Sequence, residues 1–256
     1  MMNDKAVSEA IGFILILGIV ISGIGLVTLY GYPVLVKEQS NTDVKNMERA
    51  MIVIQNDMKS LCFKNVPYKE TTLQVSGGTL AVVNASDSEA YFTIETSTPD
   101  GTYDSGPLSI GGLRYRSDRG TEVITLENGA VMTRQEGAPG SAMLAEPRWF
   151  HDRDPDTNKT TLVVYIMKIT ADEPMAKSGM GAVRMSLEGT TTSVYTPTDP
   201  VRVTYGPDSD NDLSVAWENY LTGSSVGMQR IADNQYQQND VDKLVIKVYT
   251  IKIYGI

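Results

Sequence analysis

The segment from Ala10 to Val36 contains no Asp, Glu, Lys or Arg, and most of its residues are apolar. As an α-helix it extends about 40 Å, which is more than the hydrocarbon core of a bilayer requires. A secretory signal would have a shorter apolar stretch followed by a small-residue cleavage site. A fully buried core helix would need a large α-helical domain around it, which the later sequence does not supply. The segment therefore predicts a transmembrane helix, with Tyr30 and Tyr32 near the membrane–water interface at its far end.

The residues after Pro33 predict an amphipathic continuation of this helix. Apolar side chains recur there at spacings of three and four, which places them on one helix face. The residues of this face are Val44, Met47, Ala50, Met51, Ile54, Met58 and Leu61. Pro33 removes one helix hydrogen bond, so a kink or break is expected at the join. We expect the apolar face to pack on the domain that follows, with Cys62 as a small core residue there.

Beyond residue 65 the helical period gives way to short segments of alternating polarity. Ser76-Gly77-Gly78 is typical of a hairpin turn, and Glu127-Asn128-Gly129 marks a second turn. The segments TTLVVYIMKIT and LVIKVYTIKIYGI are dense in β-branched residues and predict central strands covered on both faces. Only AWENYLTG is typical of a short helix in the later half. The predicted fold is α+β: a long N-terminal helix, then an antiparallel, sandwich-like β domain.

The charge balance argues against a nucleic-acid partner. The chain carries 22 Lys and Arg against 31 Asp and Glu, a formal net charge of -9. Phosphate binding requires a basic face, and the sequence has none.

The sequence offers little from which a catalytic site could be built. One cysteine, Cys62, excludes an intrachain disulfide, and one histidine, His151, excludes a multi-histidine metal site. P-loop, dinucleotide-binding and zinc-ligand spacings are absent from the sequence. We therefore expect a structural or binding role without enzymatic activity and without a cofactor, apart from the calcium ion considered next.

Two acidic stretches are candidates for a metal site. Asp152, Asp154 and Asp156 alternate with other residues as the ligands of calcium loops do. Thr157 stands where an EF-hand has glycine, and Val163 stands where it has the bidentate glutamate. The stretch is therefore not an EF-hand, and a loose calcium site and a solvated turn remain the two interpretations. Asp208, Asp210 and Asp212 form a second, shorter cluster with a weaker claim.

Two sequons, Asn84-Ala85-Ser86 and Asn158-Lys159-Thr160, permit glycosylation of Asn84 and Asn158 if the domain lies outside the cell.

The segment from Lys5 to Gly12 resembles the processing region of archaeal type IV prepilins, which carry a class III signal peptide. In that family a short charged leader ends in a basic residue followed by Ala or Gly. A membrane-embedded prepilin peptidase cleaves there and leaves the apolar helix on the mature protein. The resemblance implies that Lys5 and Ala6 are the last leader residues and that Val7 is the new N-terminus.

The resemblance extends to a group of uncharacterised archaeal pilin-like membrane proteins. The similarity to that group is carried by AVSEAIGFILILGIVISGIGLVTLYG and NMERAMIVIQNDM. A looser similarity is found in ENGAVM and VAWENYL. It implies a leader over 1–6, a transmembrane helix over 7–36, an amphipathic extension over 37–64 and an extracellular β-rich domain over 65–256. The segment 136–147 is the one place where that domain could divide into two; a single domain is our prediction.

The implied function is that of a minor or major subunit of a cell-surface filament, assembled through the N-terminal helix after cleavage. Its partners would be the membrane, the prepilin peptidase and other pilin subunits. It would be a single-pass protein of the cell membrane, with its C-terminal domain extracellular. The alternative is a non-polymerising, single-pass surface protein with a binding or adhesion role.

Glu9 departs from the pattern of bacterial pilins. Their glutamate stands at the fifth mature position and is thought to meet the N-terminal amine of a neighbouring subunit, whereas Glu9 would be third. A carboxylate at the edge of an apolar helix is costly in lipid unless it is paired or lies near the surface. Assembly and a headgroup position both remain open for Glu9.

Small residues lie along the same helix and favour close helix packing. They are Gly12, Gly18, Ser22 and Gly25, and Gly18 and Ser22 have the spacing of a small-xxx-small motif.

Overall fold

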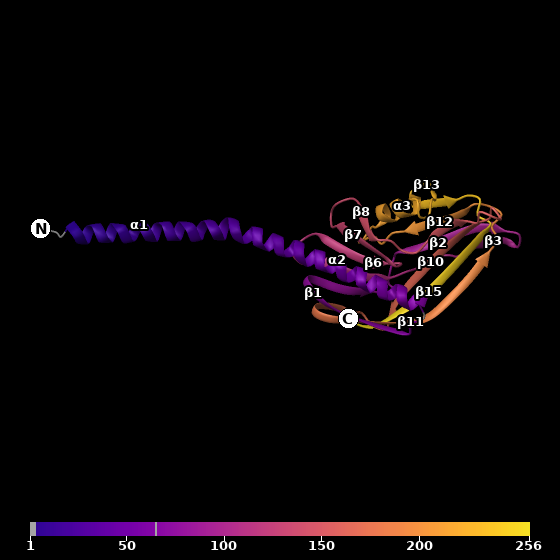
Figure 1. Cartoon of the computed structure of the whole chain (residues 1–256), viewed down its shortest axis with the longest axis horizontal. Coiled ribbons are helices and arrows are strands. Elements are labelled where there is room, and N and C mark those ends of the chain that lie inside the picture. The colour runs from indigo at the N-terminus through magenta and orange to yellow at the C-terminus, as the bar shows by residue number, and fades with distance from the viewer. Residues whose placement is uncertain (1–3, 65) are drawn as a thin grey trace. The chain divides into compact units, whose positions relative to one another are not determined.

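One uninterrupted run of helix precedes all the strands in the computed structural model, which describes residues 4–64 and 66–256, with side chains from residue 11 onward (Figure 1). It consists of α1 (Asp4–Leu26), the π-helical turn η1 (Val27–Gly31) and α2 (Tyr32–Lys64). The chain forms two compact units, Met1–Asp43 and Val44–Ile256, so the boundary between them falls within α2.

The predicted kink or break at Pro33 takes a milder form in the structure. The helix continues through Pro33, and η1 ends two residues before it. Proline lacks the N–H that would bond four residues back, and its ring crowds that carbonyl. A π-helical turn is one way to accommodate such a disturbance without ending the helix.

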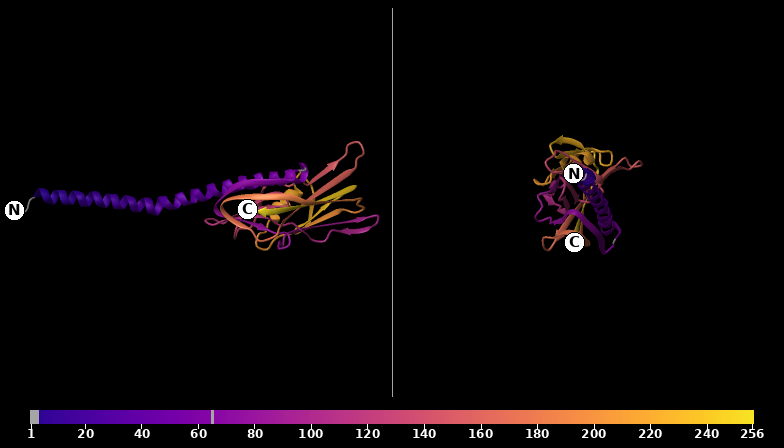
Figure 2. Two further views of the ribbon diagram at one scale, coloured as in Figure 1. Left: turned by 90° about the horizontal axis from the view of Figure 1, so that it is seen from below. Right: turned by 90° about the vertical axis from the view of Figure 1, so that its left-hand side faces the viewer.

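The unit Val44–Ile256 contains two β-sheets in addition to the end of α2 and the short helix α3 (Ser214–Thr222) (Figure 2). The strands are β1 (Tyr68–Val83), β2 (Tyr91–Thr98), β3 (Gly101–Asp104), β4 (Leu108–Ser109), β5 (Gly112–Ser117), β6 (Glu122–Glu127), β7 (Ala130–Gln135), β8 (Ser141–Ala145), β9 (Phe150–Arg153), β10 (Thr160–Ala171), β11 (Ala176–Tyr195), β12 (Val201–Gly206), β13 (Gln229–Ala232), β14 (Gln235–Gln238) and β15 (Lys243–Gly255). The larger, nine-stranded sheet has the order β8-β7-β6-β5-β1-β11-β15-β10-β9, and the smaller has the order β13-β14-β12-β2-β3, with β4 paired to β2. A long N-terminal helix followed by a β-rich unit confirms the α+β class.

The two segments richest in β-branched residues form interior strands of the nine-stranded sheet, but the predicted cover on both faces is confirmed for β10 alone. β10 lies between β9 and β15, and β15 lies between β10 and β11. Their mutual pairing is parallel, with Thr161 opposite Lys243 and Ala171 opposite Ile253, whereas all other strand pairs described are antiparallel. β10 is buried along nearly its whole length, as is usual for parallel strands, whereas β15 alternates between buried and half-buried positions.

The hairpin predicted at Ser76-Gly77-Gly78 is wrong. β1 runs straight through these residues, and its register against β11 shifts between Val75 and Leu80, which marks an irregularity of the bulge type. Gly77 has φ 61°, and a Cβ on Gly78 would lie 2.3 Å from the Arg116 carbonyl oxygen of β5. The glycines therefore allow close approach of a neighbouring strand instead of reversing the chain.

The turn predicted at Glu127-Asn128-Gly129 is confirmed. Asn128 and Gly129 have φ of 47° and 72°, the positive values that a two-residue type I′ hairpin requires, and they join β6 to β7. The predicted short helix at AWENYLTG is also present, as α3.

The apolar face of the amphipathic helix packs in the core of the β-rich unit, as predicted. Its most buried residues are Met47, Met51, Ile54, Met58 and Leu61, all fully buried. The helix contacts the nine-stranded sheet: the Phe63 ring lies 5.1 Å from the Tyr165 ring of β10. Cys62 is buried beside this face, and desolvation raises the pKa of its thiol to about 12, in keeping with a core residue.

The segment 136–147 does not separate two subdomains. It contains β8, which pairs with β7 at the edge of the nine-stranded sheet, and it lies within the single unit Val44–Ile256.

Gln55 is a buried polar residue of α2 whose side chain bonds the helix to the β6–β7 hairpin. Its Nε2 donates to the carbonyl oxygens of Gly129, at 2.6 Å, and Glu146, at 2.9 Å. Lys59 Nζ also donates to the Glu146 oxygen, at 2.8 Å. The Glu146 carbonyl would therefore keep a hydrogen bond from Lys59 if Gln55 were replaced, whereas the Gly129 carbonyl would lose its side-chain donor.

We expect Gln55→Leu to lower the free energy of unfolding by about 1–2 kcal/mol, because the buried Gly129 carbonyl loses its donor. Urea unfolding of the full chain, followed by tryptophan fluorescence, measures the change. Asn56→Leu changes the adjacent, exposed residue and serves as the control, with an expected effect within about 0.5 kcal/mol. Equal losses in the two variants would contradict this role of Gln55.

Candidate functional site

The apolar part of the helix is the largest exposed apolar surface of the described chain. Most large side chains between Ile11 and Leu35 are more than half exposed; Phe13 is 67% exposed and Leu29 is 71% exposed. The most apolar window of the helix has a mean hydropathy of 2.6 and no buried residue. This helix is long and apolar enough to cross a membrane. Scattered exposed apolar residues are ordinary in a folded protein, but a continuous surface of this kind indicates an interaction site.

The glycines of this surface have no packing role within the described residues. A Cβ on Gly12, Gly18 or Gly25 would meet no atom within 4 Å, and Ser22 is exposed. Nothing in their own unit therefore requires small residues at these positions, and the space beside them is open to a second helix.

Lys5, Ala6, Val7 and Glu9, the predicted processing and assembly residues at the N-terminus, lie within α1. Their side chains fall outside the described residues, so their predicted roles stay predictions.

Asp57 links the C-terminal part of α2 to strand β1. Its carboxylate accepts a hydrogen bond from Thr71 Oγ1 at 2.6 Å and forms an ion pair of 2.9 Å with Lys69. Burial opposes ionisation of Asp57, but the hydrogen bonds and charge from Thr71 and Lys69 outweigh it and lower the pKa of the carboxyl. Together with Gln55 this contact fixes α2 in the β-rich unit by polar bonds as well as by its apolar face.

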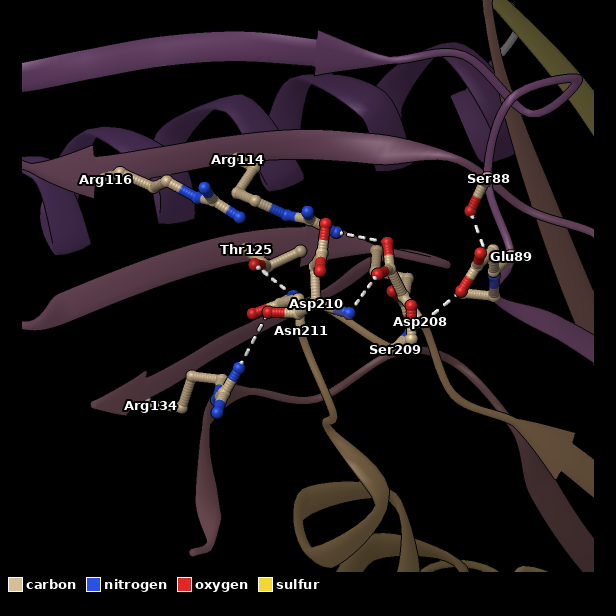
Figure 3. A network of polar contacts seen from close by, with 12 residues as sticks. Ser88, Glu89, Arg114, Arg116, Thr125, Arg134, Asp208, Ser209, Asp210 and Asn211 are labelled. Atoms are coloured by element: carbon tan, nitrogen blue, oxygen red, sulfur yellow. Dashed lines mark hydrogen bonds and ion pairs between the residues drawn. The ribbon is translucent and has the colours of Figure 1, made fainter. Parts of the chain in front are cut away.

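Asp208 and Asp210 of the second acidic cluster belong to a polar network between the two sheets (Figure 3), and the described residues include no group of three side chains that could hold a metal ion. Asp208, in the loop after β12, forms an ion pair of 2.7 Å with Arg114 of β5. Burial opposes ionisation of Asp208, but the hydrogen bond and charge of Arg114 hold the pKa of its carboxyl below the ordinary value. The same loop receives a hydrogen bond from Arg134, to the Asp210 carbonyl oxygen at 3.0 Å, and bonds Thr125 through Asn211 at 3.0 Å. The loop is thereby held against β5, β6 and β7.

Glu127, at the end of β6, is a carboxyl group inside the core with 3% of its surface exposed. Its Oε1 accepts hydrogen bonds from Tyr205 Oη at 2.9 Å and from Trp217 Nε1 at 3.0 Å. Desolvation raises the pKa of Glu127 to about 7 and outweighs these two hydrogen bonds and the charge of Arg114. The sequence identified Glu127 only as the edge of a turn, since no local pattern distinguishes a buried glutamate from an exposed one.

The three aspartates of the calcium hypothesis are exposed; Asp154 and Asp156 belong to the turn after β9, whereas Asp152 lies within β9. Asp154 Oδ1 accepts hydrogen bonds from the backbone N–H of Asp156, at 2.9 Å, and of Thr157, at 3.2 Å, and hydrogen bonds from Thr157 and Asp156 lower the pKa of its carboxyl. Within the described residues, no three His, Cys, Asp or Glu side chains are grouped so that they could hold a metal ion. The structure therefore favours the solvated-turn interpretation for Asp154 and Asp156, and it places Asp152 at an exposed position of a strand.

The two sequon asparagines differ in the state of the amide nitrogen that glycosylation would modify. Asn84 is half-buried, and its Nδ2 donates to the Ala171 carbonyl oxygen at 2.9 Å. Asn158 is exposed and adopts φ 58°, which asparagine tolerates in turns. Of the two, Asn158 is the more accessible acceptor.

The aromatic residues near the acidic clusters are packing residues. Trp149, Trp217 and Tyr220 are at most 5% exposed, and the Phe92 ring lies 4.9 Å from the Trp217 ring and 5.1 Å from the Trp149 ring.

The sequence profile of DUF7289, described as a family of unknown function, matches residues 5–253. The sequence matches no curated protein and no solved structure. The matched range covers both the apolar helix and nearly all of the β-rich unit. The chain therefore belongs to DUF7289, a family of unknown function.

Proposed function

We propose that this chain is an archaeal type IV pilin-like subunit, minor or major, of a cell-surface filament. In this proposal the prepilin peptidase cleaves after Ala6, and the mature protein is held in the membrane by residues 7–36. Its sandwich-like β domain lies outside the cell, and other pilin subunits are its partners in the filament. The role is structural and not enzymatic.

The observation that carries the proposal is the contrast between the two parts of one run of helix. The first part is apolar and has no buried residue in its most apolar window. The second part supplies fully buried residues, such as Met51 and Ile54, to the core of the β-rich unit. An apolar surface of this extent must be covered by lipid or by other chains. A helix that is part of a domain core at one end and uncovered at the other suits a subunit whose helix passes from membrane to filament.

The small residues support packing between copies of this helix. Gly18 and Ser22 stand four residues apart with open space around them. Small residues at this spacing let helix backbones approach closely, which drives association where the hydrophobic effect is weak.

Processing at the N-terminus tests the proposal directly. We expect the native protein to begin at Val7, and to keep residues 1–6 in cells that lack prepilin peptidase activity. Mass spectrometry of the N-terminal peptide distinguishes the two forms. Lys5→Glu, which removes the basic residue of the predicted site, is expected to block cleavage, whereas Asn3→Gln leaves that site intact and is the control. A native chain that begins at Met1 or Met2 in cells with an active peptidase would contradict the pilin proposal.

The alternative is a single-pass surface protein that does not polymerise and that binds a ligand or adheres through its β-rich unit. The observation in its favour is the size of that unit, which carries two sheets where helix packing alone would need much less. Sheared surface filaments separate the two functions: a subunit is recovered in them, and an unassembled anchor protein stays with the membrane.

A further inference from the structure

A polar hollow of about 470 Å³ lies where β9 and the start of β10 meet the ends of β13 and β14. Pockets of about 300–1,000 Å³ are the usual size for small ligands. Such pockets are mostly lined by apolar side chains, but every lining side chain here is polar or charged, and Gly227 is the remaining lining residue. The hollow therefore differs from an ordinary small-molecule site in its chemistry and not in its size.

Two polar atoms of the lining residues are buried without a hydrogen-bond partner among the described residues: His151 Nε2 and Gln238 Oε1. Leaving a buried polar atom unsatisfied costs about 1–3 kcal/mol, so nearly all such atoms in folded proteins have a partner. Both belong to side chains that line the hollow, so rotation of either side chain toward the hollow would let a ligand satisfy it.

The side-chain amides of the hollow are held in fixed orientations by one another. Gln237 Nε2 donates to Asn239 Oδ1 at 2.8 Å, and Asn239 Nδ2 donates to Gln229 Oε1 at 3.4 Å. Each amide carries both a donor and an acceptor group, so this chain leaves hydrogen-bonding groups of both kinds at the hollow. A hydroxyl group likewise donates and accepts at once, so a ligand rich in hydroxyls matches a lining rich in amides.

Other classes of ligand fit the lining less well. Asp240 and Asp242 outnumber Arg153, which disfavours an anion. Asp242 Oδ2 already accepts a hydrogen bond from the Thr160 backbone N–H at 2.7 Å, and no three metal-binding side chains are grouped in the described chain, which disfavours a cation. A nucleobase would need an aromatic side chain on which to stack, and the lining has none of Phe, Tyr or Trp.

A second hollow, of about 550 Å³, shares the lining residues Asn239, Asp240 and Asp242 with the first, so the two hollows are neighbours. Its other lining residues include Pro197 and Pro200, whose rings offer apolar surface. The C–H faces of a sugar ring can pack on such surface while its hydroxyls bond to polar groups.

We propose that the two neighbouring hollows bind a neutral saccharide, with one sugar unit among the amides of the first hollow and a following unit against the prolines of the second. Asn239, Asp240 and Asp242 line both hollows and so lie between the two sugar units. The proposal concerns the β-rich unit alone and holds whether or not the chain assembles into a filament.

Ligand-observed saturation-transfer NMR on the full chain tests the proposal. The chain is produced in a host without N-glycosylation, so that Asn158 at the rim carries no glycan, and is kept in a zwitterionic detergent, because maltoside headgroups are themselves sugars. The probes are glucose and maltotriose, N-acetylglucosamine and chitotriose, and mannose and mannotriose. We expect saturation transfer to at least one trisaccharide, with an affinity about tenfold higher than that of its monosaccharide.

Gln238→Met removes the amide whose oxygen has no partner and keeps the length of the side chain, and we expect it to weaken that binding about tenfold. Gln235→Met makes the same change at an exposed position of the same strand and is expected to leave binding unchanged. His151→Phe is a second variant for the case in which Gln238→Met does not fold. Absence of transfer to all six probes, or equal binding by the Gln238 and Gln235 variants, would overturn the proposal. A thermal shift produced by calcium chloride alone and lost in Asp240→Asn would overturn it in favour of a cation site.

Discussion

Deletion of residues 1–43 is expected to transfer the protein from the membrane fraction to the soluble fraction while the β-rich unit stays folded. The deletion removes the whole exposed apolar segment, including Phe13 and Leu29. The buried apolar residues of the described chain all lie from Val44 onward, in one compact unit, so the core is retained. Ultracentrifugation of cell lysates measures the transfer, and far-UV circular dichroism with thermal unfolding measures the fold.

A point substitution provides a control that does not shorten the chain. Ile16→Arg places a charge within the apolar segment and costs roughly 2.5–3.5 kcal/mol of insertion free energy near a helix centre, whereas Ile16→Leu costs almost none. We therefore expect about a hundredfold weaker membrane insertion for the arginine variant. If the truncated chain still sedimented with membranes, the β-rich unit itself would have to carry the membrane contact.

Glu127→Gln is expected to stabilise the protein by about 3 kcal/mol at pH 8 and to have little effect at pH 4.5. The folded-state pKa of Glu127, about 7, lies above its ordinary value of 4.5. Below pH 4.5 the carboxyl is protonated in both states and contributes no pH dependence. Between pH 4.5 and 7 the unfolded chain loses the proton while the folded protein keeps it, so stability falls as pH rises. Glutamine cannot ionise, and its oxygen can still accept the hydrogen bonds from Tyr205 and Trp217.

Urea unfolding between pH 4.5 and 8, followed by far-UV circular dichroism, gives the free energies needed for this comparison. Glu95→Gln, which changes an exposed glutamate on β2, is the matched control and should keep the pH dependence of the wild type. A pH dependence that is the same for the wild type and for Glu127→Gln would show that Glu127 ionises with an ordinary pKa in the folded protein.

The predicted elements agree with the structure where a local sequence pattern is compatible with one structure only. The spacing of Met47, Met51, Ile54 and Met58 specifies an apolar helix face, and a buried face is what the structure has. Asn128-Gly129 between alternating segments specifies a type I′ hairpin because few other residue pairs adopt two positive φ values.

The predictions failed where a local pattern is shared by two structures. Ser76-Gly77-Gly78 suits a turn or an irregular strand, and the choice depends on Arg116, far along the chain, whose carbonyl approaches Gly78. The parallel pairing of β10 and β15 was not predicted for the same reason, because strand composition indicates burial but not direction.

Most of the polar sites could not be predicted from the sequence, because their partners come from distant parts of the chain. The acidic residues near Asp154 and Asp208 were visible as clusters, but their partners are backbone N–H groups and a distant arginine. The hollow beside His151 is formed by two segments far apart in the chain, β9 in one sheet and β14 in the other. It therefore depends on the tertiary fold and not on a local pattern. An amide-rich segment such as Gln235 to Asn239 has no periodic signal that distinguishes a binding surface from an ordinary edge strand.

The position of β15 has a consequence for how the protein is made. β15, residues Lys243–Gly255, pairs with β10 on one side and β11 on the other, in the interior of the nine-stranded sheet. During synthesis the ribosome makes these residues after all the other strands, so until then β10 and β11 have no partner between them. Pairings of such long sequence separation also form slowly. The nascent chain therefore stays without its finished nine-stranded sheet until β15 has been made, and β10 and β11 are exposed to other strand partners during that time.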